Sequence, residues 1–364
     1  MKKSLIALAV LAAAGTASAQ SSVTLFGIVD ATIAHGSGTI ASKTQLTNSG
    51  YNSSRLGFRG TEDLGGGLSA SFWLEAAINN DDGTGGGTNT NNQLPNASVP
   101  AGTQGLTFAR RSTVSLAGGW GEVRVGRDYT STFYNLSVFD PYGYNGVGTT
   151  VLAARSLLAT TTPVQVRVSN AIGYFLPAKL GGFYGQAQYY LGENLRNGAA
   201  NEDDGRGFNF RLGYATGPFN VAAAFNKIDV TSAAGVATDV KTVNIGGQWD
   251  FGVAKLMGSW QRDRQAGVAS GRGGLVGAVV PVGPGLIRVA YSRYTVDNNA
   301  IASSDPRATK IALGYVHNLS KRTALYATYA RLKNSGGSAL ALNGASTGIN
   351  SRSNGYDLGI RHSF

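Results

Sequence analysis

The sequence contains no cysteine and only three histidines among its 364 residues. Without cysteine, the chain has no disulfide framework and no thiolate chemistry. It also lacks a long apolar run beyond the first twenty residues, because the best stretch, 275–287, is interrupted by Pro281 and Pro284. A membrane-spanning helix needs about 20 apolar residues, so we expect no helical span in this part of the chain.

The three histidines argue against catalysis and against a metal site. His35, His317 and His362 fall where loops, rims or strand ends are expected. A hydrolytic site needs a histidine positioned beside a serine or an acidic residue, and no such constellation is visible. No histidine cluster suggests a transition-metal site, and we interpret the acidic loop at 193–204 as a solvated surface rather than a calcium site. We therefore expect no enzyme activity, no cofactor and no metal.

The first nineteen residues have the pattern of a secretory signal peptide. Lys2 and Lys3 precede a short apolar core at 5–14, and an Ala-Ser-Ala cleavage signal follows at 17–19. This order of a positive start, an apolar core and small residues is typical of an exported chain. We expect a signal peptide over 1–19 and a mature chain that begins near Gln20.

The charge of the chain is strongly positive. It has 31 basic and 20 acidic residues, and removal of Lys2 and Lys3 leaves 29 against 20, a net charge of +9. Such an excess attracts anions, whether solutes, nucleic acids or lipid headgroups. Because the chain is expected to be exported, we expect no nucleic-acid partner.

Alternation of apolar and polar residues with period two dominates the mature chain. In 207–215, for example, Phe208, Phe210 and Leu212 share one face, and Asn209 and Arg211 share the other. About 16 such segments of roughly 8–12 residues are joined alternately by tight turns and by long polar loops such as 264–271, a plan typical of outer-membrane barrels. The pattern predicts an all-β, transmembrane antiparallel barrel of about 16 strands. The alternative is a secreted β-sandwich or adhesin, whose strands would also alternate.

Several stretches resemble the general diffusion porins of Gram-negative bacteria, in the branch typical of beta-proteobacteria. They are VTLFGIVD at 23–30, SRLGFRGTEDLGGGL at 54–68, RRSTVSLAGGWGEVRVGRD at 110–128, LGYVHNLSKRTALYATYA at 313–330 and the terminal IRHSF. The resemblance implies one 16-stranded barrel over 20–364, located in the outer membrane and usually a homotrimer. It also implies that a third extracellular loop, here roughly 129–163, folds inward and narrows the pore.

The resemblance implies further partners. Outer-membrane lipids and lipopolysaccharide would surround the barrel, and the barrel-assembly machinery would read the last strand. The residues that match the assembly signal are Tyr356, Leu358, Ile360 and Phe364, whereas His362 departs from the apolar or aromatic residue that is usual there.

Parity along the strands predicts which charged residues face the pore, because an arginine that faces lipid near the midplane costs about 2–4 kcal/mol. Leu56 and Phe58 should face lipid, which turns Arg55 and Arg59 inward. By the same test the inward set includes Glu75, Arg111, Arg124 and Arg167, with Arg211, Lys255, Arg288 and Lys310 as weaker candidates. The neighbours of Arg167, namely Val164, Val166 and Val168, are expected to face lipid, and Arg110 would enter the pore only through a bulge.

In the related porins, a ladder of basic residues on the wall faces acidic groups on the inward loop. The matching basic positions are Arg55, one of Arg110 or Arg111, and Arg167, to which parity adds Arg59. Asp140 is the best candidate for the loop carboxylate, and the secondary candidates are Glu75, Asp81 and Asp82. Several arginines clustered at a narrow point would favour anions, because they stay charged and offer several donors to a carboxylate or phosphate.

These features together predict a general diffusion porin with anion preference, which passes small hydrophilic solutes, especially anionic ones, without energy input. The nearest alternative is a channel of the same fold that is selective for organic acids or phosphate. A plugged adhesin or receptor barrel is a further alternative, and an outer-membrane hydrolase comes last.

Overall fold

The computed structural model describes residues 22–93, 104–153, 166–232, 235–298 and 305–364. The expected signal peptide over 1–19 therefore lies outside the described residues. None of the described helices is long and apolar enough to cross a membrane.

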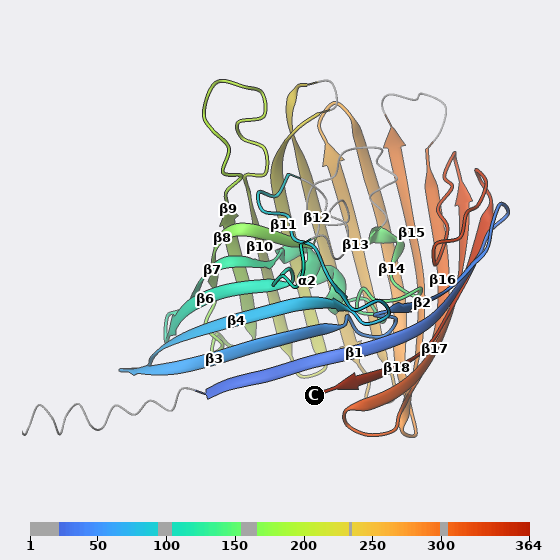
Figure 1. Ribbon diagram of the computed structural model, residues 1–364, viewed down its shortest axis with the longest axis horizontal. Coiled ribbons are helices and arrows are strands. Elements are labelled where there is room, and N and C mark those ends of the chain that lie inside the picture. The colour runs from blue at the N-terminus through green and yellow to red at the C-terminus, as the bar shows by residue number, and fades with distance from the viewer. Residues whose placement is uncertain (1–21, 94–103, 154–165, 233–234, 299–304) are drawn as a thin grey trace, which may run out of the picture.

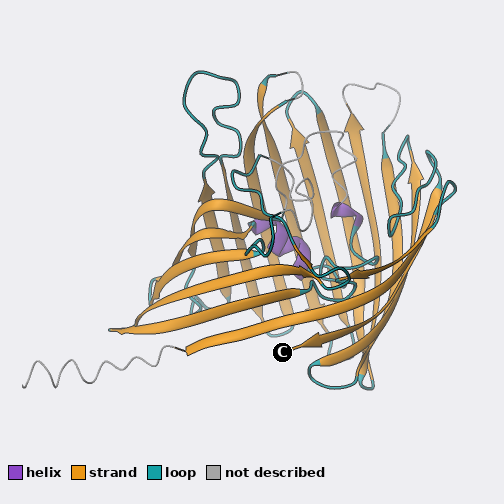
Figure 2. Cartoon of the chain, viewed as in Figure 1, coloured by secondary structure: helices purple, strands orange, loops and turns teal. Residues whose placement is uncertain are grey.

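Sixteen antiparallel strands form one closed barrel (Figures 1 and 2), which confirms the predicted fold. They are β1 (Ser22–Ser37), β3 (Arg55–Gly65), β4 (Leu68–Asn79), β6 (Arg111–Gly118), β7 (Gly121–Tyr129), β8 (Arg167–Phe175), β9 (Phe183–Tyr190), β10 (Gly207–Thr216), β11 (Phe219–Thr231), β12 (Ala237–Asp250), β13 (Lys255–Gln265), β14 (Ala269–Val282), β15 (Gly285–Asn298), β16 (Arg307–Asn318), β17 (Thr323–Ser335) and β18 (Arg352–Ser363). Two short strands, β2 (Lys43–Asn48) and β5 (Thr84–Gly85), belong to connections between them.

The barrel closes between its first and last strands. β1 pairs with β18 over ten residue pairs on one side, and with β2 and β3 on the other. Phe364 exchanges two backbone hydrogen bonds of 3.1 Å with Gly27, so the terminal residue is part of this seam. The four residues of the expected assembly signal, Tyr356, Leu358, Ile360 and Phe364, all expose their side chains.

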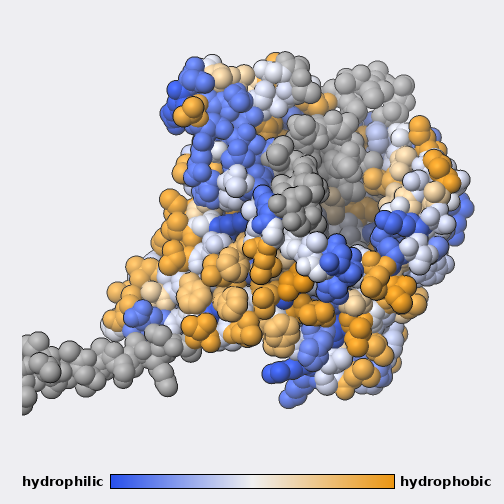
Figure 3. Space-filling model, viewed as in Figure 1, coloured by the Kyte–Doolittle hydropathy of each residue, from blue (hydrophilic) through white to orange (hydrophobic). Residues whose placement is uncertain are grey.

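The two faces of the barrel differ as alternation requires. Phe210 and Leu212 on β10 expose about half of their side chains, as do Ile311 and Leu313 on β16, whereas the residues between them are polar or pack inside. Figure 3 shows hydrophobic side chains gathered over the front strands β1, β3 and β4. In a closed sheet this apolar outer face is the surface that lipid would cover.

Short turns join the strands at one end of the barrel and longer connections join them at the other. The turn at 66–67 requires glycine, because Gly66 and Gly67 have positive φ values of 61° and 80°. The expected long loop at 264–271 was wrong: β13 continues to Gln265 and β14 begins at Ala269, which leaves three residues between them.

The third long connection enters the barrel. It contains the helix α2 (Ser131–Val138) and a 3₁₀ helix (Val151–Ala153), and Figure 2 shows both surrounded by strands. Thr130 caps α2 by accepting a hydrogen bond from the Phe133 amide. α2 contacts β9–β12, and the 3₁₀ helix contacts β14–β16. We call residues 130–153 the inner segment.

The two faces of β12 provide a test of the lipid-facing surface. Ile245 points outward and is 48% exposed, whereas Gln248 has inward parity on the same strand. Ile245→Lys should destabilise the folded barrel in lipid by about 2–4 kcal/mol, because a cationic side chain would face hydrocarbon. Gln248→Lys should cost less than about 1 kcal/mol, because its amine would face water.

Urea titration of the barrel folded into lipid vesicles measures both values. Equal losses for the two variants would contradict the assignment of the two faces.

Candidate functional site

The inward face of β3, β4, β6, β7 and β8 concentrates arginine. We call this surface the basic wall; its charged members are Arg55, Arg59, Arg110, Arg111, Arg124, Arg127 and Arg167, with Glu75, Glu122 and Asp128. Seven positive and three negative charges leave an excess of four positive charges on these residues.

One group in the basic wall surrounds the Glu75 carboxylate. Arg110 donates from Nε to Glu75 Oε1 over 2.5 Å, and Arg55 Nη1 lies 3.4 Å from the same oxygen. The Tyr129 hydroxyl donates to this oxygen over 3.3 Å and accepts from Arg110 Nη2 over 2.8 Å. The Trp73 indole donates to the other carboxylate oxygen over 3.1 Å. One carboxylate thus pairs with two guanidinium groups, so Glu75, Arg55 and Arg110 together keep a positive charge.

Arg167 adds to that charge from β8. Its guanidinium carbon lies 4.8 Å from the centre of the Tyr129 ring, and Nη2 donates to the Tyr129 hydroxyl over 3.4 Å. Within the described part of the chain, no carboxylate oxygen lies within 4 Å of its guanidinium. Its contacts are with an aromatic face and a hydroxyl, which orient the group without neutralising it.

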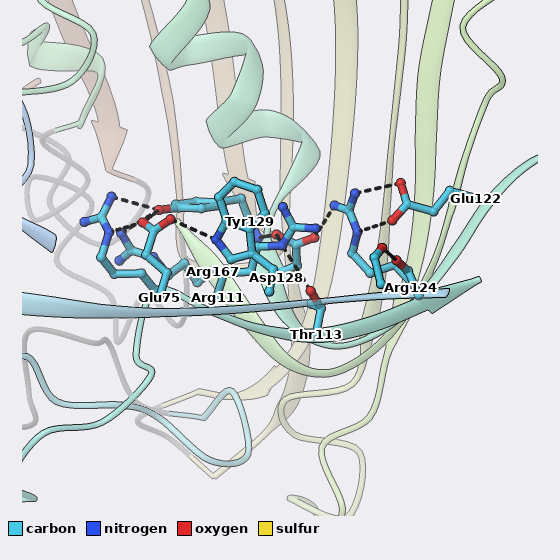
Figure 4. Close-up of polar contacts among 12 residues, drawn as sticks. Glu75, Arg111, Thr113, Glu122, Arg124, Asp128, Tyr129 and Arg167 are labelled. Atoms are coloured by element: carbon cyan, nitrogen blue, oxygen red, sulfur yellow. Dashed lines mark hydrogen bonds and ion pairs between the residues drawn. The ribbon is translucent and has the colours of Figure 1, made fainter. Parts of the chain in front are cut away.

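A second group lies further along β7 toward the short turns. Arg124 donates to Glu122 Oε2 over 2.9 Å and to Asp128 Oδ2 over 2.6 Å, so its charge is fully matched (Figure 4). Arg111 lies 3.8 Å from Asp128, donates to Thr113 over 3.1 Å and stacks on the Trp73 ring.

Arg59 completes this second group. Its guanidinium lies over the rings of Phe26 and Trp73, at 5.4 and 5.2 Å from their centres. No ion-pair partner lies within 4 Å of it among the described residues. Arg59 and Arg167 therefore differ from the ion-paired arginines of the basic wall. Two aromatic rings contact the guanidinium of Arg59, and one aromatic ring with its hydroxyl contacts the guanidinium of Arg167.

Both Arg110 and Arg111 lie inside the barrel, so their direction alone does not choose between them. Arg111 opens β6 with inward parity, opposite Glu75. Arg110 precedes the strand, and its amide donates to the Glu75 carbonyl over 3.0 Å. The alternation of side chains along the strand therefore does not determine the direction of the Arg110 side chain. The two arginines belong to different groups: Arg110 contacts Glu75, and Arg111 contacts Trp73 and Asp128.

The expected outward position of Val168 is wrong. Val168 is fully buried, in a cluster with Ala171, Tyr190 and Ile228. The pairing of β7 with β8 shifts register between Gly126 and Asp128, and Asn170 has a positive φ of 57°, so strict alternation fails at this point. Val166 is half-buried, and Val164 lies outside the described residues.

Three of the weaker candidates hold the inner segment in place. Arg211 donates to the Asn135 side chain over 2.5 Å and to the Tyr184 hydroxyl over 3.2 Å. Lys310 donates to the Val147 carbonyl over 3.0 Å. Arg288 lies between the rings of Tyr51 and Tyr142, at 4.7 and 4.6 Å from their centres. These cations face inward, but they are covered by the segment that they bind.

Lys255, the last weaker candidate, lies at the short-turn end of β13. Its amine is 3.4 Å from Asp250, and both side chains are substantially exposed. It belongs to the rim of the barrel and lies outside the basic wall.

The structure places Asp140 inside the inner segment instead of opposite the arginines. Its carboxylate is buried and accepts from the Tyr142 amide over 2.9 Å and from the Thr150 amide over 3.1 Å. Burial raises the pKa of Asp140 above its ordinary value, although these hydrogen bonds and the nearby Lys310 oppose the rise. Asp140 therefore shapes the fold of the segment.

Asp81 and Asp82 also lie away from the arginines, in the connection after β4. Asp81 accepts from the Asn48 side chain over 2.9 Å. Asp82 is exposed and accepts from the amide and hydroxyl of Thr84, which lower its pKa. Among the described residues, no three His, Asp or Glu side chains converge where a metal ion could bind.

Parity turns Trp73 inward together with Glu75, but sequence reasoning missed its contacts with arginines and the other residues that organise the basic wall. Phe26, Trp73 and Tyr129 orient the arginines, and Glu122 and Asp128 match Arg124. The Tyr129 ring also stacks on Phe133 of α2, at 5.3 Å between ring centres, so the wall touches the inner segment.

Comparison with known proteins gives a consistent result. A family model described as Gram-negative porin matches residues 5–337. The chain is 42% identical to outer membrane porin protein 32 of Delftia acidovorans and 29% identical to an outer membrane porin protein of Bordetella pertussis, in each case over the whole of both chains.

Comparison with solved structures supports the same fold. An anion-selective porin from Comamonas acidovorans superposes with a TM-score of 0.81 at 39% identity, covering 94% of this chain and 100% of that one. The trimer form of OmpT from Vibrio cholerae superposes with a TM-score of 0.65 at 15% identity, covering 94% and 99%, and at that identity it supports the fold alone.

The Glu75 group gives a stability prediction. Glu75→Gln would leave Arg55 and Arg110 without a counter-charge, and we expect a loss of about 2–3 kcal/mol, below the ~3–5 kcal/mol of a fully buried pair, since Arg55 is partly exposed. Glu122→Gln should cost less than about 1 kcal/mol, because Arg124 keeps Asp128 and Glu122 is partly exposed. Urea midpoints of the folded barrel compare the two; a smaller loss for Glu75→Gln would count against the arrangement.

Asp140 gives a pH prediction. Its folded-state pKa is raised, so the folded chain binds this proton more tightly than the unfolded chain does. The stability of the wild type relative to Asp140→Asn should therefore increase as the pH falls through the folded pKa toward 3.8. Asp82→Asn should show the opposite slope, because the folded pKa of Asp82 is lowered and its contribution is lost on acidification.

Urea titrations between pH 3 and 7 would measure both slopes. A pH-independent difference for Asp140→Asn, or the same sign for both variants, would show that the Asp140 carboxylate is not buried as described.

Proposed function

Because the chain belongs to the Gram-negative porin family, we propose that it forms a water-filled channel through the outer membrane and passes small hydrophilic solutes passively, with a preference for anions. The solutes would cross between the basic wall and the inner segment. The name of the anion-selective porin from Comamonas acidovorans supports the preference by similarity. We propose no catalytic step, since the matched family and the neighbouring structures are porins.

The observation that carries the anion preference is the pair of arginines without ion partners. Arg59 and Arg167 are oriented by aromatic rings and have no carboxylate within 4 Å among the described residues. Arg55 and Arg110 share one carboxylate, which leaves a further positive charge. These charges stand ready for a solute, because aromatic contacts fix a guanidinium without neutralising it.

The size of the effect follows from distance. One unit charge about 7 Å from a solute ion contributes roughly 2 kcal/mol at an effective dielectric constant near 20. Salt screens the contribution over about 8–10 Å under physiological conditions. Charges in a wide pore would therefore do little, whereas charges beside the inner segment act at short range. Arg55, Arg59, Arg110, Arg111 and Arg167 are our proposed basic side of the constriction, with Glu75 among them and Arg124 as a matched neighbour.

The assembly of the protein is part of the proposal. We infer that residues 1–19 are a signal peptide and that 20–364 form the mature barrel. We also infer a homotrimer, which the trimeric form of the distant OmpT neighbour is consistent with. The exposed residues Tyr356, Leu358, Ile360 and Phe364 are our candidates for recognition by the barrel-assembly machinery, and the apolar outer face is the surface for lipids and lipopolysaccharide.

A second candidate function is selective binding of organic anions. A recess of about 350 Å³ is lined by Arg59, Arg111 and Arg124 with Trp73 and Glu122. Guanidinium groups beside an aromatic face suit a small carboxylate. Conductance that saturates at low concentration of one organic anion would favour this function, and ohmic conductance would favour general diffusion.

Bilayer recording tests the proposal. With a salt gradient across a planar bilayer, the wild type should give a reversal potential that favours chloride. The variant R55S/R110S/R167S should lose most of that preference, because it removes three of the excess charges.

The matched control is R272Q/R293Q/R307Q, which removes the same charge from exposed or partly exposed residues of the outer face. It should keep the wild-type reversal potential. Unchanged selectivity in the first variant, or equal loss in the control, would reject the basic wall as the source.

A further inference from the structure

The connection between β17 and β18 also folds against the inside of the barrel. We call these residues, 336–351, the last connection. It packs on the inward face of β1 and β18 at two buried glycines, Gly36 and Gly355. A Cβ at Gly36 would collide with the Leu342 carbonyl oxygen, and a Cβ at Gly355 would lie 3.0 Å from the Leu342 Cβ. The two strands therefore come close to the last connection because these positions have no side chain.

The last connection shares a buried apolar cluster with the inner segment. Leu342 of the last connection and Val147 of the inner segment both belong to this cluster. Both side chains lie against Gly355, where a Cβ would come within 2.5 Å of Val147 Cγ2. The inner segment thus packs on the last connection as well as on the barrel wall.

One buried carboxylate joins the two segments. Asp357 on β18 accepts from the Val147 amide with Oδ2 over 2.7 Å, and from the Asn343 side-chain amide with Oδ1 over 2.8 Å. Hydrogen bonds to an ionised group are stronger than those between neutral groups. Because Lys310 donates to the Val147 carbonyl over 3.0 Å, both backbone groups of Val147 are held.

Asn343 is suited to this position by its backbone and by its side chain. Its φ is 50°, in the left-handed region that asparagine tolerates better than most residues. The same side-chain nitrogen donates to the His35 carbonyl over 3.3 Å and to the Tyr356 carbonyl over 3.0 Å. Asn343 therefore ties the last connection to β1, to β18 and, through Asp357, to the inner segment.

The last connection is also tied to the connection that follows β1, which lies beside it (Figure 1). Ala41 and Ser346 lie directly opposite each other and exchange two backbone hydrogen bonds, of 3.1 and 3.0 Å. The hydroxyls of Thr39 and Thr347 are 3.2 Å apart. The last connection thus runs without a break in its contacts from this pairing to the inner segment.

We infer that the last connection is a strap that sets the position of the inner segment, and thereby the open width of the channel, through the hydrogen bonds of Asn343 and Val147 to Asp357. This inference rests on the channel proposed above. The basic wall supplies the charge that a solute meets, and the strap holds the opposite boundary of the path. Without Asn343, Val147 keeps fewer attachments, so the inner segment gains other positions that narrow the channel for part of the time.

Single-channel recording at fixed voltage tests the strap. N343A should spend about tenfold more time in partly closed levels than the wild type, because it loses a hydrogen bond to a buried charged group. D357N should close at least as often, because the Val147 amide also loses its charged partner. Only barrels that have folded and inserted contribute to the recording, so misfolded protein does not affect the comparison.

The matched control is N350A, in the same connection. Asn350 also has a positive φ, 61°, and its side chain accepts from the Gly337 amide over 2.8 Å, within the last connection. N350A therefore introduces similar backbone strain and leaves the bonds to Asp357 intact. It should record like the wild type.

A disulfide provides a reversible version of the test. The chain contains no cysteine, and directly opposed residues that exchange two backbone hydrogen bonds have Cα atoms about 5.5 Å apart, which suits a disulfide. In N343A/A41C/S346C, the oxidised form should regain most of the wild-type behaviour, because Leu342 is then kept against Val147. Reduction should restore the closures of N343A.

Equal closing of N343A and N350A would overturn the inference, as would identical records of the oxidised and reduced triple variant. These results differ from a failure of the channel itself. A wild type that does not conduct contradicts the channel, whereas a conducting wild type that N343A reproduces contradicts only the strap.

Discussion

A charged side chain that faces the hydrocarbon of a bilayer destabilises the protein. This constraint determines on which face of each strand the charged residues lie. A strand that crosses a membrane alternates between lipid and lumen, so every second position is available to charge. The arginines of β3, β6, β7 and β8 take these positions, and the opposite face of β6, β7 and β8 exposes apolar residues such as Val114, Val123 and Ile172. Both faces of the barrel follow from this one rule.

Charge on the inward face has two different uses. Arg211, Arg288 and Lys310 contact the inner segment or its flanking side chains, and Asp357 accepts from its Val147 amide over 2.7 Å. These groups fix the segment against β10–β18. The arginines of the basic wall lie on the other side of the barrel, where Arg59 and Arg167 keep their charge. The first set positions the segment, and the proposed selectivity depends on the second.

Charge on the outward face appears only where the apolar surface ends. Outward basic residues such as Arg272 on β14 and Arg307 on β16 lie within a few residues of the long-loop ends of their strands, and Val276 and Leu313 lie nearer the middle. The same constraint that directs Arg55 inward therefore restricts outward arginines to the level of the headgroups. In this account, the basic wall is the charged surface that acts on solutes.

The sequence predicted the barrel, the strand number and the inward direction of Arg55, Arg59, Arg111 and Arg124. It could do so because the alternation of apolar and polar residues along a strand is visible in one sequence. It gave the wrong face for Val168, since a register shift breaks that period, and it left the choice between Arg110 and Arg111 open, since Arg110 lies at a strand end. It also placed Asp140 opposite the arginines, although the carboxylate binds amides of its own segment. Hydrogen bonds within an irregular segment leave no periodic pattern in a sequence.

The salt dependence of ion selectivity tests the central claim most directly. If the unpaired charges of the basic wall select anions by electrostatics, the permeability ratio of chloride to potassium should exceed one at low salt. It should then fall toward the ratio of the mobilities in free solution as the Debye length shrinks from about 30 Å at 0.01 M to about 3 Å at 1 M. A ratio that is independent of salt, or that favours potassium at low salt, would contradict the account.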